Sequence, residues 1–228
     1  FHDIYPNLPL ALDYVDLRSV FRDPNLRSII AKALVPLVTM IKPDLLLDIP
    51  LSISPLVATI SDMTKIPMVT IRRDNKKHGV HSTILGEYKS KKTVLIIDDI
   101  LSALAYTKIE AIRAVKDAKL VSFAVLVVVD REEGGKEVLE REGLIVHSLL
   151  SLSFLRSLYC KNGFITQEQY IKIETASRVL KEATFEIRNR DFLCRQINAL
   201  TLMQKWGVCC EMSDSVKSDC FLYGPFPS

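Results

Sequence analysis

The sequence predicts an α/β protein with a parallel sheet flanked by helices and a helical extension at the C-terminal end. Short apolar segments rich in β-branched residues alternate with longer segments in which apolar residues recur every three or four positions. The short segments cover residues 44–49, 93–97, 121–129 and 144–147, and the longer ones cover 26–41, 55–63, 106–115, 149–158 and 167–183. Strands and helices that alternate in this way form parallel sheets with a helix layer on each face.

Local signals support the individual elements in chain order. Asp23 and Pro24 precede the first long helix as an N-cap residue and a first-turn proline. The segment 121–129 reads VSFAVLVVV, an apolar run with the length of a buried strand. Residues 186–205 can continue the last helix, whereas 206–228 show no clear period and are expected to be irregular.

Length, charge and cysteine content restrict the class of protein. A chain of 228 residues can form one domain and an appendage. Its net charge of +3 comes from basic residues interleaved with acidic ones, which argues against nucleic-acid binding. No apolar run is expected to span a membrane. The five cysteines lie in the C-terminal third without a CxxC pair, which favours reduced thiols and a cytoplasmic location. The chain begins at Phe1 without methionine, so a targeting segment could have preceded it.

Acidic residues stand at the ends of three predicted strands. They are Asp48, the pair Asp98-Asp99, and Asp130, which Arg131 follows. Because open parallel sheets bind ligands at the carboxyl ends of their strands, these residues are expected to form one binding rim. The alternative is that they only form turns and helix caps. Acids at three strand ends favour the binding rim.

Several blocks of this sequence resemble the orotate phosphoribosyltransferase domain of UMP synthase. They are YVDLRSV at 14–20, IPMVTIRR at 66–73, KKHG at 76–79, VLIIDDILS at 94–102 and a block at 128–153 that begins VVDREEGGK. The resemblance covers residues 1–185 and implies a type I phosphoribosyltransferase fold. Residues 186–228 resemble a worn start of the orotidylate decarboxylase domain, which stops here before its barrel. The expected division is therefore 1–185 and 186–228.

The resemblance implies a transfer of the phosphoribosyl group to orotate. The family joins orotate to the ribose of phosphoribosyl pyrophosphate with Mg²⁺, releases pyrophosphate and usually forms a homodimer. The family pattern places Asp98 and the catalytic Asp99 on the ribose hydroxyls, and the catalytic Lys76 and His78 on the leaving diphosphate. No protein-bound metal site is expected. Such a site must bind one phosphate, neutralise the diphosphate and hold the base near the ribose carbon.

The phosphate loop after the acidic pair departs from the family pattern. The family has threonine, a small residue, glycine and a second hydroxyl residue there, because backbone N–H groups close on the phosphate. In this chain Ser102 keeps the first hydroxyl and Ala103 the small residue, but Leu104 replaces the glycine and Ala105 the second hydroxyl. We expect Leu104 to hinder the phosphate. The loss of two charge-assisted hydrogen bonds weakens binding by about 10²–10⁴-fold.

The residues on the diphosphate side depart from the family pattern as well. Residues 7–9, Asn-Leu-Pro, stand where the resemblance implies a lysine. Asp48 stands where the pyrophosphate loop usually has glycine, so a carboxylate is expected to repel the anion. Arg73, Lys76 and His78 fit the pattern of a mobile lid. The alternative for this polar segment is a solvated hairpin tip, and the sequence does not decide between the two.

The base side keeps the family pattern. Arg131 matches the arginine that binds the orotate carboxylate, a task that suits a planar guanidinium. Ser102 can serve as the hydroxyl that faces the base. The alternative for Arg131 is a set of surface ion pairs with Glu132 and Glu133, which contribute little stability.

Two functional hypotheses follow. The first is an orotate phosphoribosyltransferase of pyrimidine biosynthesis, which converts orotate and phosphoribosyl pyrophosphate to orotidylate with weak or absent activity. The second is a catalytically inactive paralogue that serves as a structural or interaction subunit and dimerises through an inherited interface. The phosphate loop favours the second hypothesis for activity, and the overall resemblance favours the first for ancestry.

Overall fold

A six-stranded sheet forms the centre of the fold in the described part of the chain. The computed structural model describes residues 11–72 and 83–205, and side chains up to 185 and at 187. The strand order is β3-β2-β1-β4-β5-β6, and every neighbouring pair is parallel except β2 and β3. The strands are β1 (Leu45–Asp48), β2 (Met68–Ile71), β3 (Ile84–Leu85), β4 (Thr93–Leu101), β5 (Val121–Asp130) and β6 (Ile145–Ser151).

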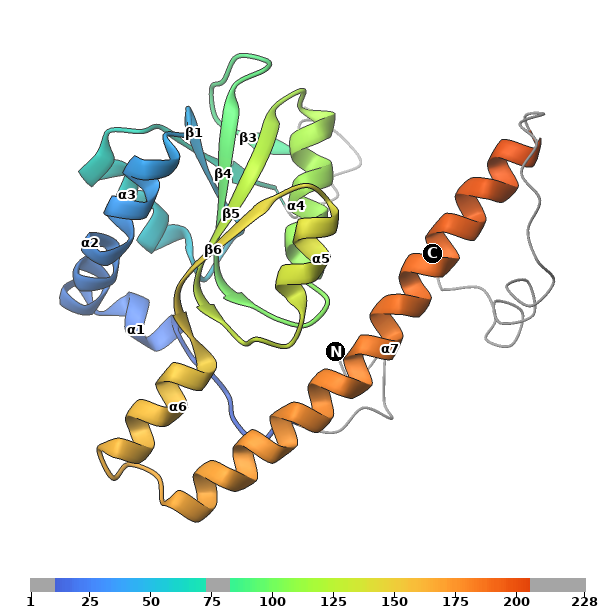
Figure 1. Cartoon of the computed structure of the whole chain (residues 1–228). Helices are drawn as coiled ribbons and strands as arrows, with labels where there is room; N and C mark the ends of the chain where they lie inside the picture. Colours follow the sequence, from blue (N-terminus) through green and yellow to red (C-terminus); the bar gives the residue numbers. More distant parts are fainter. Residues whose placement is uncertain (1–10, 73–82, 206–228) are drawn as a thin grey trace. The chain divides into compact units, whose positions relative to one another are not determined.

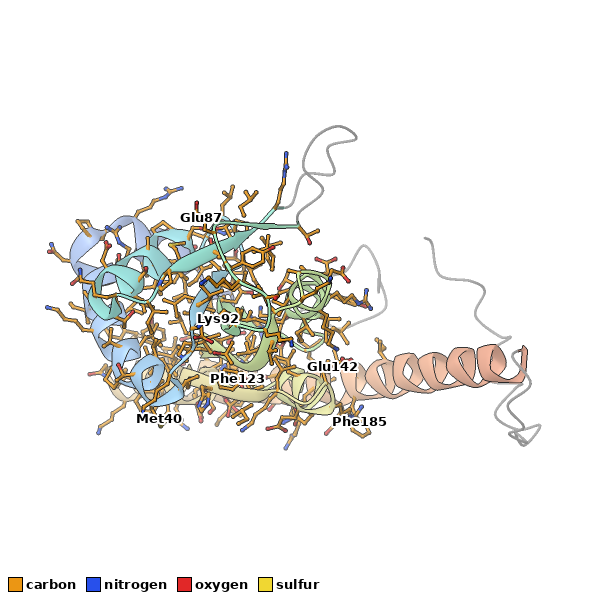
Figure 2. All side chains as sticks on the ribbon, turned by 90° about the horizontal axis from the view of Figure 1, so that it is seen from above. Met40, Glu87, Lys92, Phe123, Glu142 and Phe185 are labelled. Carbon is orange, nitrogen blue, oxygen red and sulfur yellow. The ribbon has the colours of Figure 1, made fainter. Side chains whose placement is uncertain are left out.

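Helices cover both faces of this sheet (Figure 1). The helices are α1 (Arg18–Arg22), α2 (Pro24–Ile41), α3 (Ser54–Thr64), α4 (Tyr106–Asp117), α5 (Gly135–Arg141), α6 (Leu152–Lys161) and α7 (Gln167–Lys205). Residues of α1, α2 and α3 form one hydrophobic cluster with one face of the strands, and residues of α4 and α5 form a second cluster with the other face. Side chains fill the space between the sheet and each layer (Figure 2). The central strands are therefore buried on both faces, as their continuous apolar sequence predicted.

The start of α2 follows the predicted local chemistry. The Asp23 carboxylate accepts hydrogen bonds from the backbone N–H groups of Asn25 and Leu26, and Pro24 occupies the first turn. The helix ends at Lys42, which adopts a left-handed conformation with φ of 53°. The predicted N-cap is thus confirmed.

Asp44 joins the beginnings of β1 and β4. Its carboxylate accepts hydrogen bonds from the backbone and hydroxyl of Thr93 and pairs with Lys92, whose Nζ lies 2.7 Å from Oδ1. These interactions, led by the hydrogen bond from Lys92, lower the pKa of Asp44. Lys92 is labelled in Figure 2. The contact fixes the two central strands in register at the end of the sheet opposite the binding rim.

Two boundaries differ from the sequence prediction. The strand predicted at 93–97 continues to Leu101, so Asp98 and Asp99 lie inside β4 and not after it. The helix predicted from residue 149 begins at Leu152, because β6 continues to Ser151, whose hydroxyl accepts the N–H of Phe154 as an N-cap. Tertiary pairing with β5 extends both strands beyond their most apolar residues.

The last helix crosses a division of the chain. Helix α7 continues through 186–205, as the sequence allowed. The chain divides into one unit of residues 1–184 and a second of 185–228, so the division lies within the helix. The likeness of the second unit to the start of a decarboxylase domain stays a prediction.

Helix α2 differs from the expectation that no apolar run is long enough to span a membrane. Among the described residues it is the one helix that is long and apolar enough to do so by length and composition. The core helix of a globular domain passes the same test. Ala31, Leu34 and Val38 of this helix are fully buried in the cluster under the sheet.

Candidate functional site

The predicted rim forms at the carboxyl ends of three adjacent strands. Strand β4 lies between β1 and β5, and all three are parallel. Asp48 pairs in register with Ile97, directly before Asp98, and Leu101 pairs with Asp130. The carboxylates of the three strands are therefore brought to one edge of the sheet.

Asp98 is held by an internal cation. Its Oδ2 lies 2.5 Å from Nζ of Lys108 and accepts a hydrogen bond of 3.3 Å from the Thr107 hydroxyl, while Oδ1 accepts the N–H of Asp99. The Lys108 ammonium also donates to the carbonyl of Ile100. Asp98 and Lys108 are each 4% exposed. Burial raises the pKa of Asp98, although the charge of Lys108 opposes this rise.

Lys108 was missed by the sequence reasoning. It stands in the first turn of α4 among the apolar residues Ile109, Ala111 and Ile112, where a lysine is normally solvated. The one signal in the sequence that could have indicated its contact with Asp98 was its position in the first helical turn after the acidic strand.

Asp99 is the acid with fewer protein contacts. Its Oδ2 accepts a hydrogen bond of 2.7 Å from the Ser52 hydroxyl, and its Oδ1 accepts the N–H of Ile100. The side chain is half-buried and lines a pocket. Of the two adjacent acids, Asp99 is the one that can accept hydrogen bonds from a ligand without breaking an ion pair.

A pocket of about 730 Å³ opens beside these acids. Residues of α1, of α2, of the segment after β1 with the start of α3, and of β4 with the start of α4 line it. The lining residues are Arg18, Phe21, Arg22, Arg27, Ile49, Pro50, Leu51, Ser52, Pro55, Asp98, Asp99, Thr107 and Lys108. The pocket lining thus combines two carboxylates with three arginines.

The phosphate loop does not line this pocket. Ala103, Leu104 and Ala105 are 3%, 6% and 1% exposed, and Ser102 is exposed outside the pocket. Leu104 itself does not line the pocket, and the expectation that it hinders the phosphate stays a prediction. The side chain is packed into the protein, and the loop is packed with it. Ser102 and Ala103, predicted to bind substrate, are not brought to the pocket in this structure.

The backbone of the loop is held from two sides. The N–H of Ala105 donates to the carbonyl of Ser102 over 3.2 Å. Gly135, the first residue of α5, packs so closely that a Cβ built there meets the same carbonyl oxygen at 2.1 Å. Ala105 precedes α4 in a left-handed conformation with φ of 49°. The loop is a compact turn wedged between α4 and α5.

Ala105→Gly is expected to raise the free energy of unfolding by up to about 1 kcal/mol, because only glycine adopts the left-handed conformation without strain. Ala105→Thr, which restores the family hydroxyl, is expected to lower it by more than about 1 kcal/mol, since a β-branched residue is disfavoured at this φ. Urea titrations measure both. Ala118→Gly at φ of −75° is the control and should be destabilising. Equal effects of the two glycine variants would contradict the assigned strain.

Asp48 is buried next to the start of α3. It is fully buried, its Oδ2 accepts a hydrogen bond from the Ser54 hydroxyl at the start of α3, and its Oδ1 has no partner among the described residues. It does not line the pocket. The expectation that this carboxylate repels the anion stays a prediction.

Arg131 belongs to a partly buried ion-pair network. Its Nε and Nη2 both lie 2.8 Å from Oε1 of Glu133, and Nη2 lies 3.6 Å from Asp13. Asp13 also pairs with Arg156, which binds Glu174 of α7. The pair with Glu133 that the alternative predicted is therefore present, but the Arg131 side chain is 12% exposed, so this is not a surface ion pair. Arg131 does not line the pocket, and its contact with orotate stays a prediction.

The remaining predicted site residues lie outside the described part of the chain. They are Arg73, Lys76 and His78, together with residues 7–9. Within the described ranges there is no group of three or more His, Cys, Asp or Glu side chains that could hold a metal ion.

The fold and this rim define a class. A mostly parallel six-stranded sheet with helices on both faces is the type I phosphoribosyltransferase fold, and it is shared with UMP synthase of Leishmania donovani. That structure matches with a TM-score of 0.65 and 29% identity, over 71% of this chain and 35% of the other. No protein-family model matches the chain.

Sequence relatives identify the family. The orotate phosphoribosyltransferase of Aquifex aeolicus is 32% identical over 147 residues, which are 62% of this chain and 80% of the relative. The bovine uridine 5'-monophosphate synthase is 30% identical over 168 residues, or 73% of this chain. The chain belongs to the orotate phosphoribosyltransferase family. It spans about a third of the length of the bovine protein, of which the match covers 34%.

Proposed function

We propose that this chain transfers the phosphoribosyl group of phosphoribosyl pyrophosphate to orotate, in pyrimidine biosynthesis, at a low rate. Family membership supports the reaction. The observation that carries the proposal is the position of Asp99, which lies at the carboxyl end of the sheet, half-buried, on the wall of a pocket large enough for a small-molecule ligand.

The acidic wall suits the ribose of the donor. Asp99 keeps its position through Ser52 and its own strand, so it can accept a ribose hydroxyl without reorganisation. Its negative charge also stabilises the positive charge that develops on the ribose carbon as pyrophosphate departs. Asp98 fixes Asp99 through its contact with the Asp99 N–H. Lys76, His78 and Arg73 remain the proposed ligands of the diphosphate.

The acidic side of this site also suits the proposed Mg²⁺. Magnesium is commonly held by one or two carboxylates together with the phosphates of a substrate. Asp99 is the described carboxylate on the pocket wall that carries no ion pair, which fits an ion that arrives with the donor. When bound, such an ion would neutralise charge on the departing diphosphate.

The buried loop supports the low rate. The amides after the acidic pair must approach a phosphate for tight binding, and here residues 103–105 are buried and outside the pocket. Donor binding therefore relies on other groups of the pocket.

Orotidylate formation from orotate, phosphoribosyl pyrophosphate and Mg²⁺ tests the proposal. We expect slow turnover that Asp99→Asn reduces by about 10²-fold or more, since it removes a preorganised charge beside the ribose. Asp62→Asn, on the exposed face of α3, is the matched control and should retain the rate. Chromatographic product analysis provides the readout. A rate unaffected by Asp99→Asn would contradict the assigned site.

A second candidate is an inactive paralogue that serves as a subunit. The burial of residues 103–105 favours it, because a closed loop leaves no amide cradle for phosphate. This candidate, like the active one, is proposed to form a homodimer and to be cytoplasmic. It predicts no orotidylate and no calorimetric heat with the donor, together with a dimer by light scattering. Turnover lost in Asp99→Asn would exclude it.

A further inference from the structure

The pocket lining provides cations that the sequence patterns did not assign. We propose that Arg18 and Arg22 of α1 bind the diphosphate group of the donor. This inference rests on the proposed function and deepens it. It assigns the diphosphate to residues of α1 that line the pocket. In the sequence, residues 7–9 stand where the resemblance implies a lysine.

Helix α1 presents the two arginines together. Positions 18 and 22 are four residues apart, so their side chains lie on the same face of the helix. Phe21 lies beside them, is 1% exposed and anchors the helix in the hydrophobic cluster under the sheet. All three residues line the pocket. The buried ring thus fixes the helix while both guanidinium groups remain exposed at the pocket.

Arg27 holds this helix in place. Its Nη1 donates to the carbonyl of Phe21 over 2.8 Å, and its Nε donates to the Thr59 hydroxyl of α3 over 3.2 Å. The carbonyl lies in the last turn of α1, where a cation is favourable. Arg27 is therefore a positioning residue, with donors already used by the protein, whereas Arg18 and Arg22 form no ion pair within the described part of the chain.

The two acids of the pocket have partners other than these arginines. Asp98 accepts from Lys108, Thr107 and a backbone N–H, and Asp99 accepts from Ser52 and a backbone N–H. Arg18 and Arg22 are therefore two exposed cations at the pocket that can donate to a ligand without breaking an ion pair of the described residues. The acids and the arginines of the pocket lining suit the two ends of the donor, because ribose hydroxyls donate to carboxylates and phosphate oxygens accept from guanidinium groups.

Titration calorimetry of the full chain with inorganic pyrophosphate and Mg²⁺ tests the inference. We expect Arg18→Gln with Arg22→Gln to weaken pyrophosphate binding by about 10–100-fold, as expected for the loss of charge-assisted contacts. The charge-matched control is Arg113→Gln with Arg178→Gln, two exposed arginines that do not line the pocket. This control should bind as the parent chain does. Thermal unfolding should be similar in all three proteins, because Phe21 and Arg27 are unchanged.

Two results would overturn the inference. The first is equal pyrophosphate affinity in the two double variants, and the second is no pyrophosphate binding by the parent chain. Failure of the proposed function is a separate result. If the chain binds pyrophosphate through these arginines but forms no orotidylate, the inference about the anion site stands and the proposed function is wrong. If Arg18→Gln with Arg22→Gln leaves turnover and the KM for the donor unchanged, the proposed function stands and the inference about the arginines is wrong.

Discussion

Lys108→Met is expected to lower the free energy of unfolding by about 3–5 kcal/mol at neutral pH, because removal of one partner leaves a buried charge without compensation. Asp98 and Lys108 are each 4% exposed, and Nζ lies 2.5 Å from the carboxylate. Methionine fills a similar volume, so loss of packing is small. Urea titration followed by circular dichroism measures the change.

Two further variants separate the charge effect from other effects. Lys116→Met removes a lysine from the same helix where the side chain is 64% exposed, and it should be nearly neutral. Lys108→Met combined with Asp98→Asn removes both buried charges and should recover much of the loss. If the combination is as unstable as Lys108→Met alone, the buried ion pair is not the cause.

The loss of stability in Lys108→Met should also depend on pH, and the pKa of Asp98 determines the direction of this dependence. Burial raises the pKa of Asp98 above its unfolded value, and Lys108 is the main group that opposes this rise. In Lys108→Met the folded pKa therefore rises further. The folded variant takes up a proton as pH falls through that value, so its deficit relative to the parent chain should be smaller at pH 5 than at pH 7. A deficit that is the same at both pH values, or larger at pH 5, would contradict this assignment.

Gly135→Ala is expected to lower the free energy of unfolding toward the upper end of about 1–3 kcal/mol, since an added methyl group overpacks a rigid contact. The new Cβ would meet the Ser102 carbonyl at 2.1 Å and the Leu101 side chain at 2.9 Å. Because one of these contacts is backbone, the loop or α5 must move. Hydrogen exchange at residues 102–105 should accelerate together with the loss of stability.

Gly163→Ala is the informative control for that variant. Gly163 has no atom within 4 Å of an added Cβ, but its φ is +75°, so alanine there meets backbone strain alone. We expect a cost of about 1 kcal/mol and unchanged exchange in the phosphate loop. A Gly135→Ala chain with normal loop exchange would show that α5 does not hold the loop closed.

The sequence by itself predicted most of the elements and the acidic rim, but not α1, α5, β2 or β3. Periodicity within single segments predicted the buried strands and the amphipathic helices, and the Asp23-Pro24 cap was confirmed in α2. The rule that parallel strands present ligands at their carboxyl ends placed Asp99 at the site. These inferences succeed because they depend on neighbouring residues, or on a geometry shared by all parallel sheets.

Only the tertiary structure decided which charged groups are paired and which are available. Ser52 reaches Asp99 across 47 residues of sequence, and Arg156 reaches Asp13 across 143. No local pattern indicates that Lys108 is buried against Asp98, that Leu104 turns inward, or that Arg18 faces the pocket. Such outcomes depend on burial and on partners from distant elements, and burial sets the energy of a charge far more strongly than sequence position does.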